Sequence, residues 1–560
     1  MLPAKNATAA LASPKSPLLL NPGGPGGSGV LLARAGASAF QDILGDDRPV
    51  IGFDPRGIGF TTPIADCWAT PPSCKGCTED HAKGLSHRIE WMNMHAAFGA
   101  LNSSDVAMKF IDTSHRSVNN LCRAKNTQLG GDSILGHAAT THVAADMVSI
   151  VDAWERWVER ETASAGIVPE TVNPTKGKLV YWGFSYGTYL GATFASMYPE
   201  RVGRVILDGV VDADLYTSPM WQESLYDADK VLGQLFEYCV AVGPKCALYR
   251  SSDTGPEDVR KRYDQILREL DAHPVSFTHP EYFYPVLLRS ELIRGITFTV
   301  LYQPVLLFPA LATILNVLYE GQFEYLGPLF GDLQLLCREL GSPELNVVSD
   351  AQRAIMCGDK TSPVNLTPAE IRDRYESMAK LSQFADIWVG LMLQCNGWDV
   401  SPPHPAPQHR NQTRTEFAVL FLSNTYDPVT PLHAAVKMAL RFEDAGLLEQ
   451  KASGHCTASA VSHCTAKAVR DYVLHGKVPP PPQVDGDDYL GGKWTTCEVD
   501  EKPWQAFDSG VRVFANEEDK ILAEALEAVR DAMGEIPRWG TAARGRSSNG
   551  LGSSEQTMPL

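Results

Sequence analysis

Residues 183–187 (GFSYG) are the part of the sequence that most clearly indicates catalytic chemistry. They fit the pattern G-x-S-x-G, in which a serine occupies a sharp strand-to-helix turn and its neighbours two positions away must be small. The apolar run 178–182 predicts a buried strand before this turn, and a helix to about Met197 is predicted after it. Ser185 is therefore the predicted nucleophile. A glycine turn that fits the pattern by chance is the alternative.

A serine hydroxyl needs a base to become a nucleophile, and the motif is completed along the chain by an acid and then a histidine. Asp427 follows the predicted strand 417–422, so it is placed at a strand end, although an ordinary Asp-Pro turn would look similar. His455 lies on a later loop and is the predicted base. His433 lies too close to Asp427 for this role, and His463 falls in a stretch with helical character.

Acyl transfer also needs backbone N–H donors for the negatively charged oxygen of the tetrahedral intermediate. One donor is predicted to be Tyr186, the residue after the nucleophile. The other is predicted to come from the glycine-rich loop 22–27, with Gly24 as the first choice and Gly23 as the alternative. This loop lacks the lysine and the Ser/Thr of a phosphate-binding loop, so the sequence does not favour nucleotide binding.

Short apolar runs and amphipathic helical patterns must position these groups. Strand-like runs occur at 17–22, 50–53, 178–182, 205–207 and 417–422. Helical patterns occur at 142–160, 186–197, 432–442 and 517–533. This alternation predicts an α/β fold with a mostly parallel central sheet that is covered on both faces. Asp54 and Arg56 are predicted to brace the loop between neighbouring strands rather than to act in catalysis.

The pattern changes to mainly helical between the nucleophile and the acid. We expect residues 1–215 to form the N-terminal part of the core, and residues 216–404 an inserted helical cap. Residues 405–500 would then complete the core with the acid and the histidine, and 501–560 would hold a final helix and a disordered Gly/Ser/Arg-rich tail. The most apolar stretch, 296–319, is interrupted by prolines and predicts two buried helices rather than a membrane span.

The composition limits which partners and which cellular compartment are expected for this chain. The formal net charge of −17 argues against nucleic acid as a partner. Twelve cysteines indicate disulfides, and hence an oxidising compartment, because no second C-x-x-C or histidine pair completes a zinc site. N-glycosylation triplets begin at Asn6, Asn102, Asn365 and Asn411. The first residues, by contrast, lack the apolar core of a signal peptide.

Spacing alone does not determine the disulfide pairing. Three pairs are put forward as guesses: Cys456 with Cys464, Cys239 with Cys246, and Cys357 with Cys395. A bridge at Cys456 would also fix the loop that carries His455.

Several segments together resemble the tripeptidyl aminopeptidase and proline iminopeptidase family of α/β-hydrolases, in particular its fungal and actinobacterial branch with a TAP-like C-terminal region. The matching segments are LLLNPGGPGGSGV (18–30), GFDPRGIGFTTP (52–63), GFSYGTYLGATFASMYPERVGRVILDGVVD (183–212), AIMCGDK (354–360), CNGW (395–398), LFLSNTYDPVTPLHAA (420–435) and SGHCTAS (453–459). The resemblance implies Ser185, Asp427 and His455 as a triad, a helical cap over the site, and a secreted enzyme.

The sequence departs from that family in three respects. Family members begin with a signal peptide and two further strands before the glycine-rich loop, so the fold is expected to lack its first strands or the start to be truncated. The strand expected before the histidine is weak, because residues 447–451 (LLEQK) are polar. The acidic cap residues that bind a substrate amine cannot be matched. Glu223 and Asp227 are candidates only by position, with ordinary surface carboxylates as the alternative.

The leading hypothesis is a serine exopeptidase that releases short peptides or single residues from peptide N-termini, with no metal or organic cofactor. A carboxylesterase that acts on a small ester would use the same residues, because this fold hosts many acyl substrates. A binding protein that has lost catalysis is the hypothesis from another class. Dependence of activity on a free substrate amine separates the first two, and covalent labelling of Ser185 separates both from the third.

Overall fold

The computed structural model describes the chain except residues 6, 46, 70–80, 97, 220, 279–284, 327–347, 401–411, 487, 512–513, 515 and 536–560. The expected disordered tail at 541–560 and the sites Asn6 and Asn411 lie outside the described residues. The sequons at Asn102 and Asn365 are both exposed on the surface.

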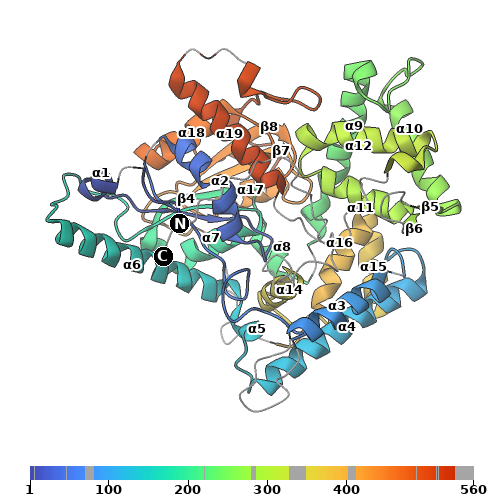
Figure 1. Cartoon of the computed structure of the whole chain (residues 1–560), viewed down its shortest axis with the longest axis horizontal. Coiled ribbons are helices and arrows are strands. Elements are labelled where there is room, and N and C mark those ends of the chain that lie inside the picture. Colours follow the sequence, from blue (N-terminus) through green and yellow to red (C-terminus); the bar gives the residue numbers. More distant parts are fainter. Residues whose placement is uncertain are drawn as a thin grey trace.

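A parallel sheet of seven strands forms the centre of the molecule (Figure 1). Its strands are β1 (Leu18–Asn21), β2 (Val50–Gly52), β3 (Leu179–Phe184), β4 (Val202–Asp208), β7 (Leu420–Tyr426), β8 (Gly446–Ser453) and β9 (Thr495–Cys497). They lie side by side in the order β2-β1-β3-β4-β7-β8-β9. Leu2 adds an antiparallel bridge to Val50 at the β2 edge. The α/β-hydrolase fold predicted from the sequence is confirmed.

Both faces of the sheet are covered, because successive strand residues point to opposite sides. Leu20, Trp182 and Ile206 pack with one group of helices. These helices are α2 (Gly29–Leu44), α18 (His463–His475) and α19 (Glu517–Glu535). On the other face, Tyr181 and Leu207 pack with α6 (Thr140–Ala165), α7 (Tyr186–Met197) and α17 (Leu432–Ala439). The near-continuous apolar strands are therefore those of a sheet buried on both sides.

Between β4 and β7 the chain forms mainly helices beside the sheet (Figure 1). They are α8 (Ala213–Thr217), α9 (Ala228–Val242), α10 (Pro256–Ala272), α11 (Ser290–Val300), α12 (Pro304–Tyr319), α14 (Val348–Gly358), α15 (Pro368–Ala379) and α16 (Ala385–Met392), with the hairpin β5 (Val275–Thr278) and β6 (Pro285–Leu288). The apolar stretch 296–319 falls on α11 and α12, as two buried helices. Among the described residues no helix is long and apolar enough to cross a membrane.

Helices from before the nucleophile also belong to this lateral region. They are α3 (His81–Ala96), α4 (Asp105–Gln128) and α5 (Ile134–His137), whereas α1 (Ala7–Ala12) contacts α6 on the opposite side of the molecule (Figure 1). Buried Asn119 on α4 donates to the carbonyl of Asn396, and buried Asp112 accepts from the Asn396 amide at 2.6 Å. The helical region beside the sheet is thus assembled from two separate stretches of the chain.

Four disulfides occur among the described cysteines: Cys67–Cys122, Cys239–Cys246, Cys357–Cys395 and Cys464–Cys497. Two of the three guessed pairs are confirmed, and the pair Cys456–Cys464 is wrong. Cys464 lies in the first turn of α18 and bonds to β9, whereas the buried Cys456 thiol donates to the carbonyl of Asp208. The histidine loop is therefore not fixed by a bridge at Cys456.

The polar segment 447–451 is a full strand of the sheet, contrary to the expectation that a strand is weak there. Leu447 and Leu448 are buried on opposite faces of β8. Gln450 is also buried, and its amide donates to the carbonyl of Thr457 at 2.8 Å. Hydrogen bonds of this kind remove the usual cost of burying a polar side chain in a sheet.

Candidate active site

Ser185 lies at the turn between β3 and α7, in a backbone conformation that residues with a Cβ rarely adopt. Its φ of 56° and ψ of −124° fall outside the common regions, and such strain persists only where the surroundings enforce it. The Ser185 N–H donates to the carbonyl of Asp208 at the end of β4 (2.9 Å). A Cβ on Gly187 would lie 2.9 Å from the carbonyl of Asn21, which explains the small residue at this position.

The glycine-rich loop after β1 lies directly against this turn. A Cβ on Gly23 would lie 2.3 Å from the Phe184 carbonyl and 2.9 Å from the Ser185 Cβ. The side chain of Asn21 accepts from the Gly23 N–H, and Gly24 lines the same pocket as Ser185 and Tyr186. The structure thus brings both candidate oxyanion donors to the nucleophile.

Asp54 holds the start of the helix that follows this loop. Its carboxylate accepts from the Ser28 hydroxyl at 2.6 Å and from the N–H groups of Val30 and Phe60. Arg56 forms an ion pair with Asp146 on α6. Both residues therefore brace the loop, at a distance from the reacting groups.

Asp427 and His455 meet at the ends of β7 and β8. The fully buried carboxylate of Asp427 lies 2.9 Å from His455 Nδ1 and accepts from the N–H groups of Val429, Thr430 and Cys456. A carboxylate held in this way orients an imidazole and stabilises its protonated form.

Buried Asn424 holds the histidine loop in place of a disulfide. Its amide donates to the carbonyls of Gly454 and Cys456, both at 2.8 Å. The His455 N–H donates to the carbonyl of Tyr302, and the Tyr302 ring packs edge-on against the imidazole. Tyr302 also lines the Ser185 pocket, so one residue contacts both His455 and that pocket.

A second buried acid, Asp208, lies beneath the nucleophile and was missed by sequence reasoning. It accepts from the Thr457 N–H at 2.7 Å and the Thr457 hydroxyl at 2.6 Å, and more weakly from Trp182. Burial raises the pKa of Asp208 to about 6, although these hydrogen bonds act to lower it. Through Thr457, Asp208 ties the end of β4 to the loop that carries His455.

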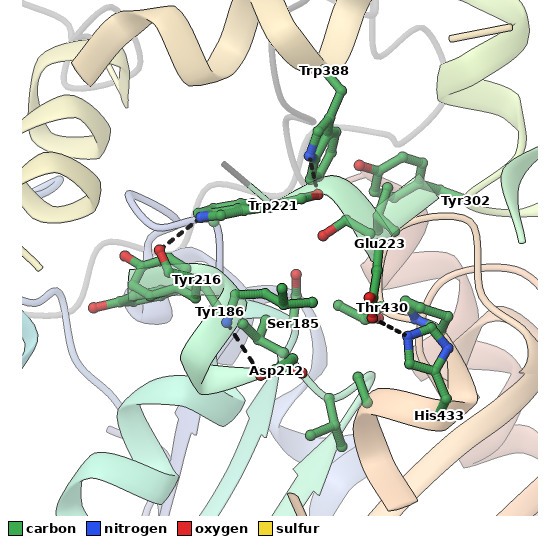
Figure 2. A pocket seen from close by; sticks show the side chains of 18 residues that line it. Ser185, Tyr186, Asp212, Tyr216, Trp221, Glu223, Tyr302, Trp388, Thr430 and His433 are labelled. Carbon is green, nitrogen blue, oxygen red and sulfur yellow. Dashed lines mark hydrogen bonds and ion pairs between the residues drawn. The ribbon is translucent and has the colours of Figure 1, made fainter. Parts of the chain in front are cut away.

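The pocket around Ser185 has aromatic walls, as Figure 2 shows. Trp221 donates to the carbonyl of Tyr216 at 2.7 Å, and Trp388 donates to the carbonyl of Trp221, so the walls are bonded to each other. The free volume in this pocket is about 40 Å³. Such a pocket suits a small part of a substrate beside the reacting carbonyl.

Glu223 and His433 form the polar side of this pocket (Figure 2). Glu223 Oε2 lies 3.3 Å from His433 Nε2, and the Glu223 side chain is 58% exposed. Burial lowers the pKa of His433, although Glu223 and Asp212 oppose this shift. A neutral His433 leaves the negative charge of Glu223 available to a ligand. Asp227, the other positional candidate, does not line this pocket but a neighbouring one.

A buried hydrogen-bond network supports Tyr186 from behind. The carboxylate of Asp359 is fully buried and accepts from the Thr140 N–H at 2.9 Å, the Thr140 hydroxyl at 2.6 Å and the Tyr216 hydroxyl at 2.9 Å. The Thr140 hydroxyl is also hydrogen-bonded to the Tyr186 hydroxyl. Burial raises the pKa of Asp359 to about 6.

Lys360 continues this network toward the pocket wall. Its ammonium donates to the carbonyls of Tyr216 at 2.6 Å and Ser218 at 2.9 Å, and burial lowers its pKa to about 7. The sequence signal for both residues was the segment AIMCGDK, to which no role had been given.

Metal-binding side chains gather at one place in the described part of the chain, namely Asp427, His455 and Cys456. The Asp427 carboxylate already accepts from His455 and three backbone N–H groups, so its oxygens are occupied. This donor set fits an acid–histidine pair better than an open metal site.

A serine at a strained elbow, two adjacent N–H donors, and a buried acid–histidine pair in this sheet define a hydrolase of the α/β fold. Comparisons with known proteins agree. Residues 175–244 match the family model described as alpha/beta hydrolase fold, and residues 380–485 match the model described as TAP-like protein. The resemblance to TAP-like α/β-hydrolases stated from the sequence is thereby confirmed.

Three relatives illustrate the range of this similarity. Serine protease Hip1 of Mycobacterium tuberculosis is 25% identical over 83% of this chain and 79% of that protein. Tripeptidyl aminopeptidase of Streptomyces lividans is 24% identical over 82% of this chain and 75% of that protein. Carboxylesterase B of M. tuberculosis is 26% identical over 83% of this chain and 78% of that protein.

Proposed function

We propose that the chain is a serine exopeptidase that releases short peptides or single residues from peptide N-termini. Glu223 is the observation that carries the proposal, because it places a carboxylate in the Ser185 pocket beside a histidine whose neutral form is favoured. A substrate ammonium group would form a charge-assisted hydrogen bond there. The relatives named as a serine protease and an aminopeptidase support a peptide substrate.

In this proposal Ser185 Oγ attacks the scissile carbonyl carbon while its proton passes to His455. Asp427 orients the imidazole, and the N–H groups of Gly24 and Tyr186 stabilise the oxyanion. When the intermediate collapses, the C–N bond breaks and His455 donates the proton to the leaving amine. Water then attacks the acyl-enzyme, with His455 again as the base, and Ser185 is regenerated.

The test combines covalent labelling with matched substrates. A fluorophosphonate is expected to label the wild-type chain and not Ser185→Ala, whose kcat is expected to fall by roughly 10⁶-fold. Peptides with a free N-terminus should be cleaved, whereas their N-acetylated counterparts should not. Equal cleavage of the two peptides, or a folded chain without labelling, would contradict the proposal.

A carboxylesterase is the second candidate, favoured by the relative of that name. It would use Ser185, Asp427 and His455 in the same way on a small ester. Rapid turnover of simple esters together with no cleavage of any free-amine peptide would select this function.

We also propose that the protein works in an oxidising, extracellular setting. Four disulfides and the exposed Asn102 and Asn365 support this. Recovery of the native protein from culture medium, with a mass that falls on N-glycosidase treatment, is the expected result. A protein retained inside cells with reduced cysteines would contradict it.

A further inference from the structure

A second pocket lies near the carboxyl ends of β7 and β8, between the start of α9 and the segment 490–494 that leads into β9. Its free volume is about 600 Å³. Ligands of open parallel sheets bind in the crevice at the carboxyl ends of the strands, so the location is one that suits a ligand. The walls combine the aromatic side chains of Tyr426 and Trp494 with the lysines Lys230, Lys451 and Lys493.

The two acids in the wall of this pocket are already engaged. The buried Glu449 carboxylate accepts from the Thr425 hydroxyl at 2.7 Å, Trp494 Nε1 at 2.7 Å and Lys451 Nζ at 2.8 Å. Burial alone would raise the pKa of Glu449, but these hydrogen bonds have the larger effect. The pKa of Glu449 is therefore lowered.

Asp227 is buried in the same way. It accepts from Lys230 Nζ at 2.8 Å and from the backbone N–H of Asp427. Lys230 and Lys451 are paired with these two carboxylates, so the third lysine of the wall, Lys493, leaves the pocket with a surplus of one positive charge. In a chain with a net charge of −17, such a surplus is a local feature that attracts an anion.

The strand order gives the direction in which this pocket lies from Ser185. The oxyanion donors come from the loop after β1, on one side of β3, whereas His455 follows β8 on the other side. A histidine that protonates the leaving amine must lie next to it, so the leaving part of a substrate points toward β7 and β8. The second pocket lies farther along in the same direction.

We propose that this pocket binds the part of a peptide downstream of the scissile bond through a carboxylate held by Lys493, Lys451 and Lys230. Apolar side chains of that segment would pack on Tyr426 and Trp494. This inference rests on the proposed exopeptidase function and adds to it a preference for substrates with a downstream negative charge. The carboxylate is either the C-terminus of a short peptide or an acidic side chain.

A kinetic experiment tests the proposal with three peptides of the same length and a free N-terminus. One ends in a carboxylate, one ends in an amide, and the third ends in an amide but carries a downstream glutamate. KM for the first peptide is expected to be about threefold lower than for the second, as for an exposed ion pair. A similarly low KM for the third peptide would assign the recognition to acidic side chains as well.

Lys493→Gln is the informative variant, because Lys493 is exposed and its backbone bonds to Gln483 do not depend on the side chain. It should raise KM for the carboxylate peptide to the value for the amide peptide and so remove the preference. Lys477→Gln is the matched control: Lys477 is an exposed lysine that follows α18 and does not line the pocket. Equal KM values for the first two peptides in the wild type, or equal effects of the two substitutions, would overturn the proposal.

A binding experiment separates this proposal from the proposed function. Ser185→Ala is titrated by calorimetry with the same carboxylate and amide peptides, so no cleavage is needed. The proposal is supported if the carboxylate peptide binds more tightly than the amide peptide and if adding Lys493→Gln abolishes this difference. This result would support the pocket even if the wild type hydrolyses only esters. Equal binding of both peptides overturns the pocket, while cleavage by the wild type would still stand.

Discussion

The pocket around Ser185 and the second pocket meet at the start of α17, yet they have opposite chemistry. Pro431 and His433 line the first, and Leu432 lines the second. The first is narrow and aromatic and has a carboxylate available at Glu223. The second is wide and presents ammonium groups above acids that are already paired. A short wall therefore separates a site for a positive group from a site for a negative one.

This difference matches the polarity of a peptide, which carries an ammonium group at one end and a carboxylate at the other. The proposed triad reaches both pockets: Ser185 lines the first, and Asp427, which follows β7, donates its backbone N–H to Asp227 of the second. A substrate that reaches both pockets would gain two favourable charge interactions that an ester without charged ends cannot make. Each prediction below perturbs one pocket or the groups between them.

The largest effect is expected for Asp427→Asn. The amide leaves the shape of the site intact but favours the wrong tautomer of His455, so kcat should fall by roughly 10⁴-fold, as in other serine hydrolases. Binding of the carboxylate peptide should be unchanged, because Asp227 is bonded to the backbone of Asp427 and not to its side chain. Steady-state kinetics and calorimetry measure the two. A loss of binding that parallels the loss of kcat would show that the pockets are not separate.

Glu223→Gln should act on the first pocket alone. Loss of one charge-assisted hydrogen bond, about 1.5–3 kcal/mol, predicts a fall in kcat/KM of about tenfold to a hundredfold for free-amine peptides. Turnover of a simple ester should not change. Glu416→Gln, at an exposed residue paired with Lys178 and outside the pocket, is the control. If ester and peptide turnover fell together, Glu223 would have a general role in the site and no specific role toward the amine.

Much of the core could be predicted from the sequence because its signals are local. The strand before Ser185 and the helix after it were predicted close to β3 and α7, because apolar runs and the G-x-S-x-G spacing lie within a few residues of each other. Residues 205–207 and 417–422 likewise predicted β4 and β7. The chain order that this motif requires predicted the acid and the histidine, and the family resemblance implied the same residues.

The groups that were missed depend on contacts between distant segments. Asp359 is linked to Tyr186 through Thr140, which is 219 residues away from Asp359. No spacing rule reveals such a contact. From the sequence alone, the polar residues of β8 predict a weak strand. Glu449 and Lys451 are polar because this end of the strand forms the wall of the second pocket. The departure from the family pattern therefore coincides with the wall of this pocket.

Asp359→Asn should have a smaller effect, which is limited to the first pocket. The amide can accept one hydrogen bond in place of two from Thr140, so Tyr186 and its oxyanion N–H lose part of their support. We expect kcat to fall about tenfold, below the effect of removing an oxyanion donor outright, with KM nearly unchanged. Tyr186→Phe should have a similar effect, and the double variant should be no worse than either single variant. Additive losses, or a change confined to the melting temperature, would contradict this positioning role.

The smallest effect concerns acid, which should strengthen the binding of a carboxylate in the second pocket. Burial raises the pKa of Asp227 to about 6, with Lys230 lowering it and Asp427 raising it further. Below this pH Asp227 is neutral and Lys230 is released for a ligand, while Glu449 remains ionised beside Lys451. Binding of the carboxylate peptide to Ser185→Ala should therefore strengthen about twofold from about pH 7 to about pH 5.

Asp227→Asn provides the control for this last comparison. It retains an acceptor for the Asp427 N–H but removes the titrating charge, so binding should be tight already at about pH 7 and independent of pH. Calorimetry in buffers of equal ionic strength measures this, because screening alone would otherwise change the affinity. If binding to Ser185→Ala weakened in acid, or if Asp227→Asn kept the same pH dependence, Asp227 would not control the positive charge of the second pocket.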